Sequence, residues 1–206
     1  PIATPAQVSN RLRAICIGVS TGGPDALQRI IPKLPAGFPV PILIVQHMPP
    51  VFTKSLADQL NRFSPLTVHE GSEGMRVEPG NTYIAPGGHQ MKVESNGMFE
   101  LLRITDDPPV NNARPSVNYL FQSAALLYGG QMAAVILTGM GNDGLKGCSD
   151  VHQAGGSVIS QDAESCVVFG MPRCVQEAGL SHHVLPLDQM AGKLCGLVGI
   201  GAVTCR

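Results

Sequence analysis

Charged residues are scarce in this 206-residue sequence, and none of them gathers into a basic stripe. Lys, Arg, Asp and Glu together make up 14% of the chain, and the formal net charge is −1. Proteins that bind nucleic acid carry clustered Lys and Arg on one face, which meets the phosphate backbone. The charge pattern therefore argues against a nucleic-acid partner.

Long apolar runs and metal-binding spacings are also missing. No apolar run approaches the roughly 18 residues of a membrane span, so membrane insertion is not expected. The six cysteines include no C-x-x-C pair, and Asp and Glu show no paired spacing typical of a metal cage. The adjacent His182 and His183 would point apart on a helix or a strand. We therefore expect neither a metal nor another cofactor.

The hydrophobic content, in contrast, is ample at 44%, and the length suits one α/β domain. Short runs rich in Ile and Val, typical of strands buried on both faces of a parallel sheet, occur at 14–19, 41–46, 133–138 and 156–161. Helical patterns lie between and beyond them, at 23–34, 51–63, 115–130, 144–156, 171–180 and 186–197. The sequence therefore predicts a doubly wound, mainly parallel sheet flanked by helices.

Two further features bear on the organisation of the chain. Asn96-Gly97 separates two strand-like runs, which predicts an antiparallel β-hairpin near residues 82–104, inserted in the sheet or added to its edge. Residues 1–11 lack the layout of a signal peptide and are interpreted as a linker remnant. We expect residues 12–197 to form the domain and residues 198–206 to form a tail.

Chemically active side chains follow each of the four predicted strands. Ser20 follows the first strand, His47 the second, Asp143 the third and Asp162 the fourth. In open α/β sheets, functional groups gather at the carboxyl ends of the strands. We therefore expect these side chains to share one edge of the sheet.

A serine, a histidine and an aspartate in one place suggest nucleophilic catalysis. A serine hydroxyl needs a neighbouring base, and histidine can take its proton near neutral pH. A carboxylate on the other ring nitrogen fixes the tautomer of the histidine and stabilises its protonated form. The amide of Thr21, just after Ser20 at the start of a helix, occupies a position where oxyanion donors are often found.

Other interpretations of the same residues stay open. A glycine-rich turn such as "GVSTGG" (18–23) can cradle a phosphate, although it lacks the full G-x-G-x-x-G and no acidic residue ends the second strand. A G-x-S-x-G match suggests a nucleophile elbow, but the order Ser, His, Asp differs from that of α/β-hydrolases. His89 could replace His47, Asp162 could replace Asp143, and a non-catalytic docking scaffold is a third class.

Six motifs, in this order, carry a resemblance to a known family. They are "IGVSTGGPDAL", "VQHMPPVFTKSLADQLN", "YIAPGGHQM", "RPSVNYLFQSAA", "ILTGMGNDGLKG" and "VISQDAESCVVFGMP". Together they resemble the catalytic domain of the bacterial chemotaxis protein-glutamate methylesterase, commonly called CheB, over roughly residues 12–195. The resemblance implies a doubly wound α/β domain, hydrolysis of glutamyl methyl esters on the cytoplasmic helices of methyl-accepting chemotaxis receptors, and, in some members, glutamine deamidation. A cytoplasmic location follows from that substrate.

The resemblance also implies roles for individual positions. The matching motifs make Ser20 the nucleophile, His47 the base and Asp143 the acid. We further expect the amides of Thr21 and Met140 to bind the oxyanion, and Arg114 to contact substrate.

The family pattern raises two further expectations. In the family, a phosphorylatable receiver domain precedes this domain and blocks its active site. We expect one in the full-length protein, although these 206 residues contain none. Asn118 stands where the family pattern has Asp, which removes a charge from a predicted helix start.

Overall fold

A computed structural model describes residues 12–201 of the chain, and its centre is one seven-stranded parallel sheet. The strands are β1 (Ala14–Val19), β2 (Ile42–Gln46), β3 (Thr67–Glu70), β4 (Asn81–Ile84), β7 (Met132–Ile136), β8 (Ser157–Gln161) and β9 (His183–Leu185). They lie in the order β3-β4-β2-β1-β7-β8-β9, and every neighbouring pair is parallel. The predicted sheet type is therefore confirmed.

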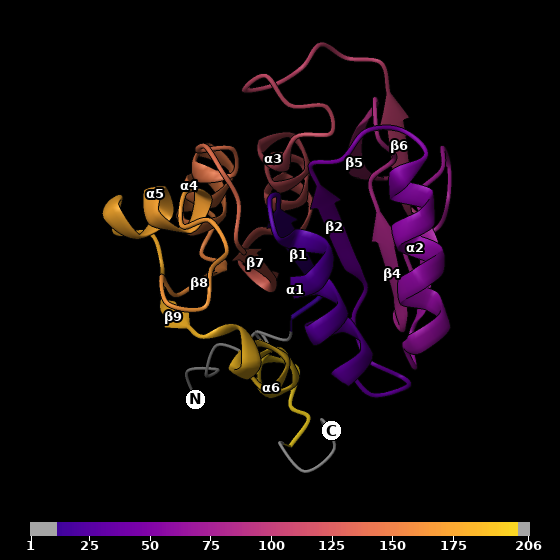
Figure 1. The fold of residues 1–206 in the computed structure, drawn as a ribbon. Helices are drawn as coiled ribbons and strands as arrows, with labels where there is room; N and C mark the ends of the chain where they lie inside the picture. The colour runs from indigo at the N-terminus through magenta and orange to yellow at the C-terminus, as the bar shows by residue number, and fades with distance from the viewer. Residues whose placement is uncertain (1–11, 202–206) are drawn as a thin grey trace, which may run out of the picture.

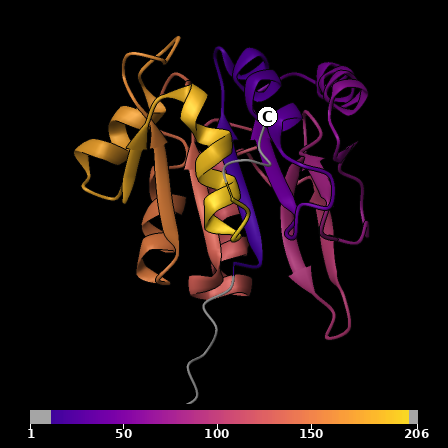
Figure 2. The same cartoon turned by 90° about the horizontal axis from the view of Figure 1, so that it is seen from below.

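Helices cover both faces of this sheet (Figure 1). Helices α1 (Gly23–Ile30), α2 (Phe52–Phe63) and α6 (Leu187–Leu197) pack on one face, and Figure 2 shows α6 crossing in front of the strands. Helices α3 (Val117–Tyr128), α4 (Leu145–Gln153) and α5 (Met171–Glu177) pack on the other face. Short 3₁₀ turns, η1 (Ile31–Lys33) and η2 (Gly129–Gln131), follow α1 and α3.

The central strands are apolar throughout because both of their faces are buried. In β1, Ile15 and Ile17 belong to the core cluster beneath α1, α2 and α6, whereas Ala14 and Cys16 belong to the cluster beneath α3, α4 and α5. Alternate side chains of a strand point to opposite faces, so a strand between two helix layers needs apolar residues at every position.

The hairpin differs in detail from the prediction. Strands β5 (Gln90–Ser95) and β6 (Glu100–Thr105) pair antiparallel around Asn96-Gly97, and they form a separate two-stranded sheet beside α3. Residues 81–84, expected to belong to the hairpin, instead form β4 of the parallel sheet. The predicted linker 1–11 and residues 202–206 of the predicted tail lie outside the described residues.

The path of the chain predicts a crevice at the carboxyl edge of the sheet. From β1 the chain builds outward through β2 to β4 and β3, then returns to the other side of β1 with β7, β8 and β9. Ligands bind in open α/β sheets where the direction of winding reverses, which here is the junction of β1 and β7. Within residues 12–201, no helix has the length and apolar character needed to cross a membrane.

Candidate active site

Ser20 and His47 follow two neighbouring strands, β1 and β2, at the carboxyl edge of the sheet. Val19 of β1 pairs with Gln46 of β2, so Ser20 and His47 are the next residues along the two strands. The His47 amide donates a hydrogen bond to the Val19 carbonyl over 3.1 Å. On the other side, the Ser20 amide donates to the Thr138 carbonyl, just after β7, over 3.0 Å. The serine therefore lies between the end of β2 and the segment that follows β7, at the carboxyl edge of the sheet.

Asp143 reaches His47 from the loop between β7 and α4. The Nε2 atom of His47 lies 2.7 Å from Oδ2 of Asp143. With Nε2 donating to this carboxylate, Nδ1 is left as an acceptor for a hydroxyl proton. The Ser20 hydroxyl makes no hydrogen bond to any residue in the described range 12–201, and catalytic hydrogen bonds are often long without substrate.

The carboxylate of Asp143 is buried but well supplied with donors. It accepts hydrogen bonds from the Val117 amide (2.7 Å), the Asn118 amide (3.1 Å) and the Ser116 hydroxyl (2.8 Å). Burial by itself raises the pKa of Asp143, but the hydrogen bonds from His47 and these three donors outweigh it, so the pKa lies below its usual value. Asp143 is therefore held as an anion, and it caps the start of α3 while it contacts His47.

The glycines around Ser20 allow close packing and a tight turn. A β-carbon at Gly18 would lie 2.4 Å from Cγ1 of Val117, at the start of α3. A β-carbon at Gly23 would lie 1.8 Å from Oε1 of Gln46. Gly22, between Ser20 and α1, has a φ of 81°, which favours glycine. The glycines thus bring α3 and Gln46 against the turn that holds Ser20.

Two polar residues of the crevice were missed by the sequence reasoning. Gln46 is buried, and its Nε2 donates to the carbonyls of Ser20 and His47, both over 3.0 Å. The Thr138 hydroxyl donates to the Thr21 carbonyl over 2.9 Å and accepts from the Val168 amide over 2.9 Å. Gln46 ends β2 and Thr138 follows β7 by two residues, and a polar residue at the end of an apolar run is a signal that could have found both.

Two backbone amides near Ser20 are candidates for binding a negatively charged oxygen. The amides of Thr21 and Met140 donate to no acceptor within residues 12–201. Met140 follows Gly139, where a β-carbon would lie 2.7 Å from the β-carbon of Ser20. Unpaired amides near a serine can stabilise the negative oxygen of a tetrahedral intermediate.

Arg114 lines the same hollow as His47. A hollow of about 360 Å³ is lined by His47, Met48, Pro49, Pro50, Gly88, Asn112, Ala113, Arg114 and Pro115. The Arg114 Nη1 atom donates to the Asp106 carbonyl over 3.3 Å. A cation is thus held in the same hollow as the imidazole ring, where an acidic substrate could reach both.

The rival residues are bonded to partners other than His47 and Asp143. His89 bonds to Asp106 through Nδ1 over 2.8 Å. Asp162 accepts from the Ser165 amide (3.0 Å) and hydroxyl (2.6 Å). Among residues 12–201, no group of three or more His, Cys, Asp and Glu side chains could hold a metal ion.

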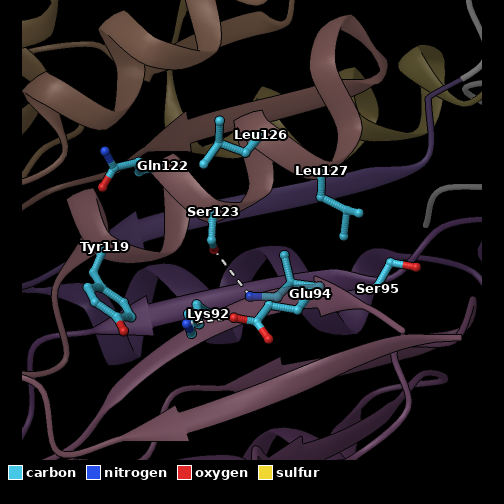
Figure 3. A pocket seen from close by; sticks show the side chains of 9 residues that line it. Lys92, Glu94, Ser95, Tyr119, Gln122, Ser123, Leu126 and Leu127 are labelled. Atoms are coloured by element: carbon cyan, nitrogen blue, oxygen red, sulfur yellow. Dashed lines mark hydrogen bonds and ion pairs between the residues drawn. The ribbon is translucent and has the colours of Figure 1, made fainter. Parts of the chain in front are cut away.

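A larger hollow, of about 570 Å³, lies between α3 and β5 (Figure 3). Tyr119, Gln122, Ser123, Leu126 and Leu127 of α3 face Lys92, Val93, Glu94 and Ser95 of β5 across it. The Val93 amide donates to the Ser123 hydroxyl over 3.2 Å, which ties the strand to the helix. This hollow contains none of the candidate catalytic residues, so size alone does not locate the site.

The chain is similar in sequence to known proteins. A model of the family described as CheB methylesterase matches residues 15–194. The protein-glutamate methylesterase/protein-glutamine glutaminase of Desulfotalea psychrophila is 51% identical over 182 residues, which cover 87% of this chain and 50% of that protein. The protein of the same name from Thermotoga maritima is 49% identical over 188 residues, covering 90% of this chain and 54% of that protein. This chain therefore spans about half the length of these curated relatives.

Among solved structures, the crystal structure of the Thermotoga maritima CheB methylesterase catalytic domain superposes with a TM-score of 0.89. The two chains are 47% identical, and the match covers 91% of this chain and 99% of that one. At this identity the likeness covers the sequence as well as the fold.

Proposed function

Because this chain belongs to the CheB methylesterase family, we propose that it is a serine hydrolase that removes methyl esters from glutamate side chains and releases methanol. The observation that carries the proposal is the contact of His47 with Asp143 at the strand end next to Ser20. The proposed substrates are glutamates on the cytoplasmic helices of methyl-accepting chemotaxis receptors. The proposed place of action is therefore the cytoplasm, and the reaction needs no cofactor.

In the first half-reaction, Ser20 attacks the carbonyl carbon of the ester while Nδ1 of His47 takes the hydroxyl proton. The negative oxygen of the tetrahedral intermediate is bound by the free amides of Thr21 and Met140. His47 then protonates the methoxide as it leaves as methanol. Asp143 holds the imidazole through Nε2 and stabilises its protonated form throughout.

In the second half-reaction, water hydrolyses the glutamyl-serine ester. His47 takes a proton from the water, which attacks the same carbonyl carbon, and the proton returns to Ser20 as the glutamate leaves. Glutamine deamidation would follow the same path with ammonia as the leaving group. The name of the relatives, protein-glutamate methylesterase/protein-glutamine glutaminase, supports both reactions.

The substrate is a side chain on a folded helix, so the crevice has to be open. Arg114, in the hollow beside His47, would contact acidic residues that flank the target glutamate. In a longer protein, we propose that a receiver domain N-terminal to this one covers the crevice until it is phosphorylated. Equal rates for this domain and for the unphosphorylated full-length protein would contradict that regulation.

The decisive experiment measures methanol release from methyl-esterified cytoplasmic fragments of receptors. We expect turnover by the wild type and none by Ser20→Ala, with folding checked by circular dichroism. Ser55→Ala, on the exposed surface of α2, is the matched control and should keep full activity. Turnover by the folded Ser20→Ala protein would overturn the assignment of the nucleophile. A wild type without turnover that binds a dinucleotide or phosphate would instead favour the phosphate-cradle interpretation.

A further inference from the structure

The N-termini of α3 and α4 cap each other at the crevice. Asp143, two residues before α4, accepts hydrogen bonds from the Val117 and Asn118 amides of the first turn of α3. In return, Oδ1 of Asn118 accepts from the amides of Gly144 (3.0 Å) and Gly147 (2.8 Å) at the start of α4. Each helix start therefore receives its side-chain cap from the other helix's leading segment.

These hydrogen bonds meet at the backbone of residues 143 and 144. The Gly144 amide lies within hydrogen-bond distance of both the Asn118 side chain (3.0 Å) and Oδ1 of Asp143 (3.1 Å). The helices also approach closely, because a β-carbon at Gly147 would lie 3.3 Å from the Asn118 Cα and 2.6 Å from the Phe121 Cβ. The Asp143 carboxylate is thus fixed by α3 while its own peptide is fixed by the Asn118 side chain.

We propose that Asn118 is a positioning residue for the contact between Asp143 and His47. Its Oδ1 atom accepts a hydrogen bond from the Gly144 amide and so fixes the backbone next to Asp143. Because it is neutral, it does this without placing a second negative charge beside the Asp143 carboxylate. The inference rests on the proposed function only where activity is the readout, since the His47–Asp143 contact can be observed without substrate.

Few charged groups near Asn118, Asp143 and His47 would offset a negative charge at position 118. Lys146 lines the same hollow of about 630 Å³ as Asn118, but it is paired with Asp150 over 2.6 Å. Arg114 shares the hollow of His47. From α5, the Cys174 thiol faces the carbonyl of Gly141 in the Asp143 loop, at 3.7 Å.

An aspartate at position 118 would accept the same two amides as Asn118 does. At a helix N-terminus it would stay ionised, and its charge would act on Asp143 and, beyond it, on the imidazole ring. The added anion would favour the protonated form of His47.

The test compares Asn118→Asp, Asn118→Ala and a control, Asn96→Ala. Asn96 is matched because its Oδ1 also accepts two backbone amides, from Met98 (3.0 Å) and Phe99 (2.8 Å), at the hairpin turn. The first readout is the titration of the His47 imidazole followed by ¹⁵N NMR, which needs no substrate. The second is the pH profile of kcat for methanol release.

For Asn118→Asp we expect the midpoint of the His47 titration and the acidic limb of the kcat profile to move to higher pH together, by about half a pH unit or more. For Asn118→Ala we expect a fall in kcat of roughly tenfold to a hundredfold with little change in KM, because Asp143 loses its fixed place. Asn96→Ala should change neither readout.

Unchanged His47 titration and unchanged kcat in both Asn118 variants would overturn the proposal. If Asn118→Ala does not fold, Asn118→Asp decides alone, because it keeps an acceptor for the Gly144 and Gly147 amides and adds a charge. A wild type without esterase activity but with the expected NMR shifts would refute the proposed function and leave the role of Asn118 standing.

Discussion

Gly139 packs directly against Ser20: a β-carbon at position 139 would lie 2.7 Å from the Ser20 β-carbon and 3.1 Å from its amide nitrogen. On the other side, the same atom would lie 2.6 Å from Sδ of Met171. The backbone of Gly139 cannot simply move away, because its amide donates to Val168 and its carbonyl accepts from Met171 and Gly170. The position therefore excludes every side chain, and the serine turn lies against the loop that carries the Met140 amide.

The first prediction is that Gly139→Ala lowers kcat for methanol release by about a hundredfold while the protein still folds. The added methyl group would push Ser20 away from the amides and the imidazole, and displacements of about 1 Å cost this much in enzymes. The control is Gly192→Ala in α6, where a β-carbon would meet nothing within 4 Å. If Gly139→Ala is as active as Gly192→Ala, the contact with Ser20 has no bearing on catalysis.

The second prediction concerns Gln46, whose amide joins the carbonyls of Ser20 and His47. Gln46→Met keeps the length of the side chain but removes both donors. We expect kcat to fall about tenfold and the free energy of unfolding to drop by about 1–3 kcal/mol, because two carbonyls in the crevice lose their partner. Chemical denaturation and methanol release measure the two effects.

The control for this change is Gln153→Met, an exposed position in α4 whose amide donates to the Ser149 hydroxyl. It should leave both quantities close to those of the wild type. Equal losses of kcat and of the free energy of unfolding in the two variants would show that the hydrogen bonds from Gln46 to the Ser20 and His47 carbonyls make no specific contribution.

The sequence allowed the sheet to be predicted because its central strands are continuous apolar runs. The strands β3 and β9 were not predicted, since they are short and partly exposed, and Asn81–Ile84 was assigned to the hairpin because it lies in the same strand-like region. Local pattern alone could not tell β4 from a hairpin strand, because its parallel partners β2 and β3 are set by tertiary pairing.

The candidate site could likewise be predicted in part. Ser20, His47 and Asp143 could be named because each follows a predicted strand, and the structure places the last two in contact. Their catalytic roles stay predictions. Gln46 ends a predicted strand and could have been found in the same way. Asn118 could not, because its hydrogen bonds to Gly144 and Gly147 join residues 26 and 29 positions apart in the chain.

The third prediction follows from the lowered pKa of Asp143. In the unfolded chain the carboxyl takes up a proton at higher pH than in the folded protein, so folding gains stability from the ionised carboxylate above the ordinary pKa of about 3.9. That stability is lost as the pH falls through the lower, folded-state pKa. We therefore expect the free energy of unfolding to fall with acidification below about pH 5.

Asp143→Asn removes this titration, so its free energy of unfolding should depend less steeply on pH than that of the wild type. Ser116→Ala, which removes one of the donors to the carboxylate, should give an intermediate slope. Urea denaturation at several pH values between 6 and 3 measures the slopes. Identical slopes in the three proteins would contradict the assignment.

At neutral pH, Asp143→Asn should also lower kcat, by about 10⁴, because the amide cannot hold the imidazole as the anion does.

The last prediction concerns Val51, which begins the turn into α2 beside the hollow that His47 lines. Its backbone has φ 74° and ψ −43°, and its side chain is 77% exposed. A branched side chain is strained at positive φ, by about 1–2 kcal/mol, and exposure means that little packing offsets the strain. We expect Val51→Gly to raise the free energy of unfolding by about 1 kcal/mol in chemical denaturation.

Val184→Gly is the control, because Val184 is an exposed valine in strand β9 at a negative φ, where glycine should lower stability instead. Pro50, the residue before Val51, lines the hollow of His47, so Val51 lies near the surface where we propose that a receptor helix binds. Val51→Gly should then raise KM for methylated receptor fragments and leave kcat unchanged. A gain in stability without a change in KM would mean that the strained valine plays no part in binding.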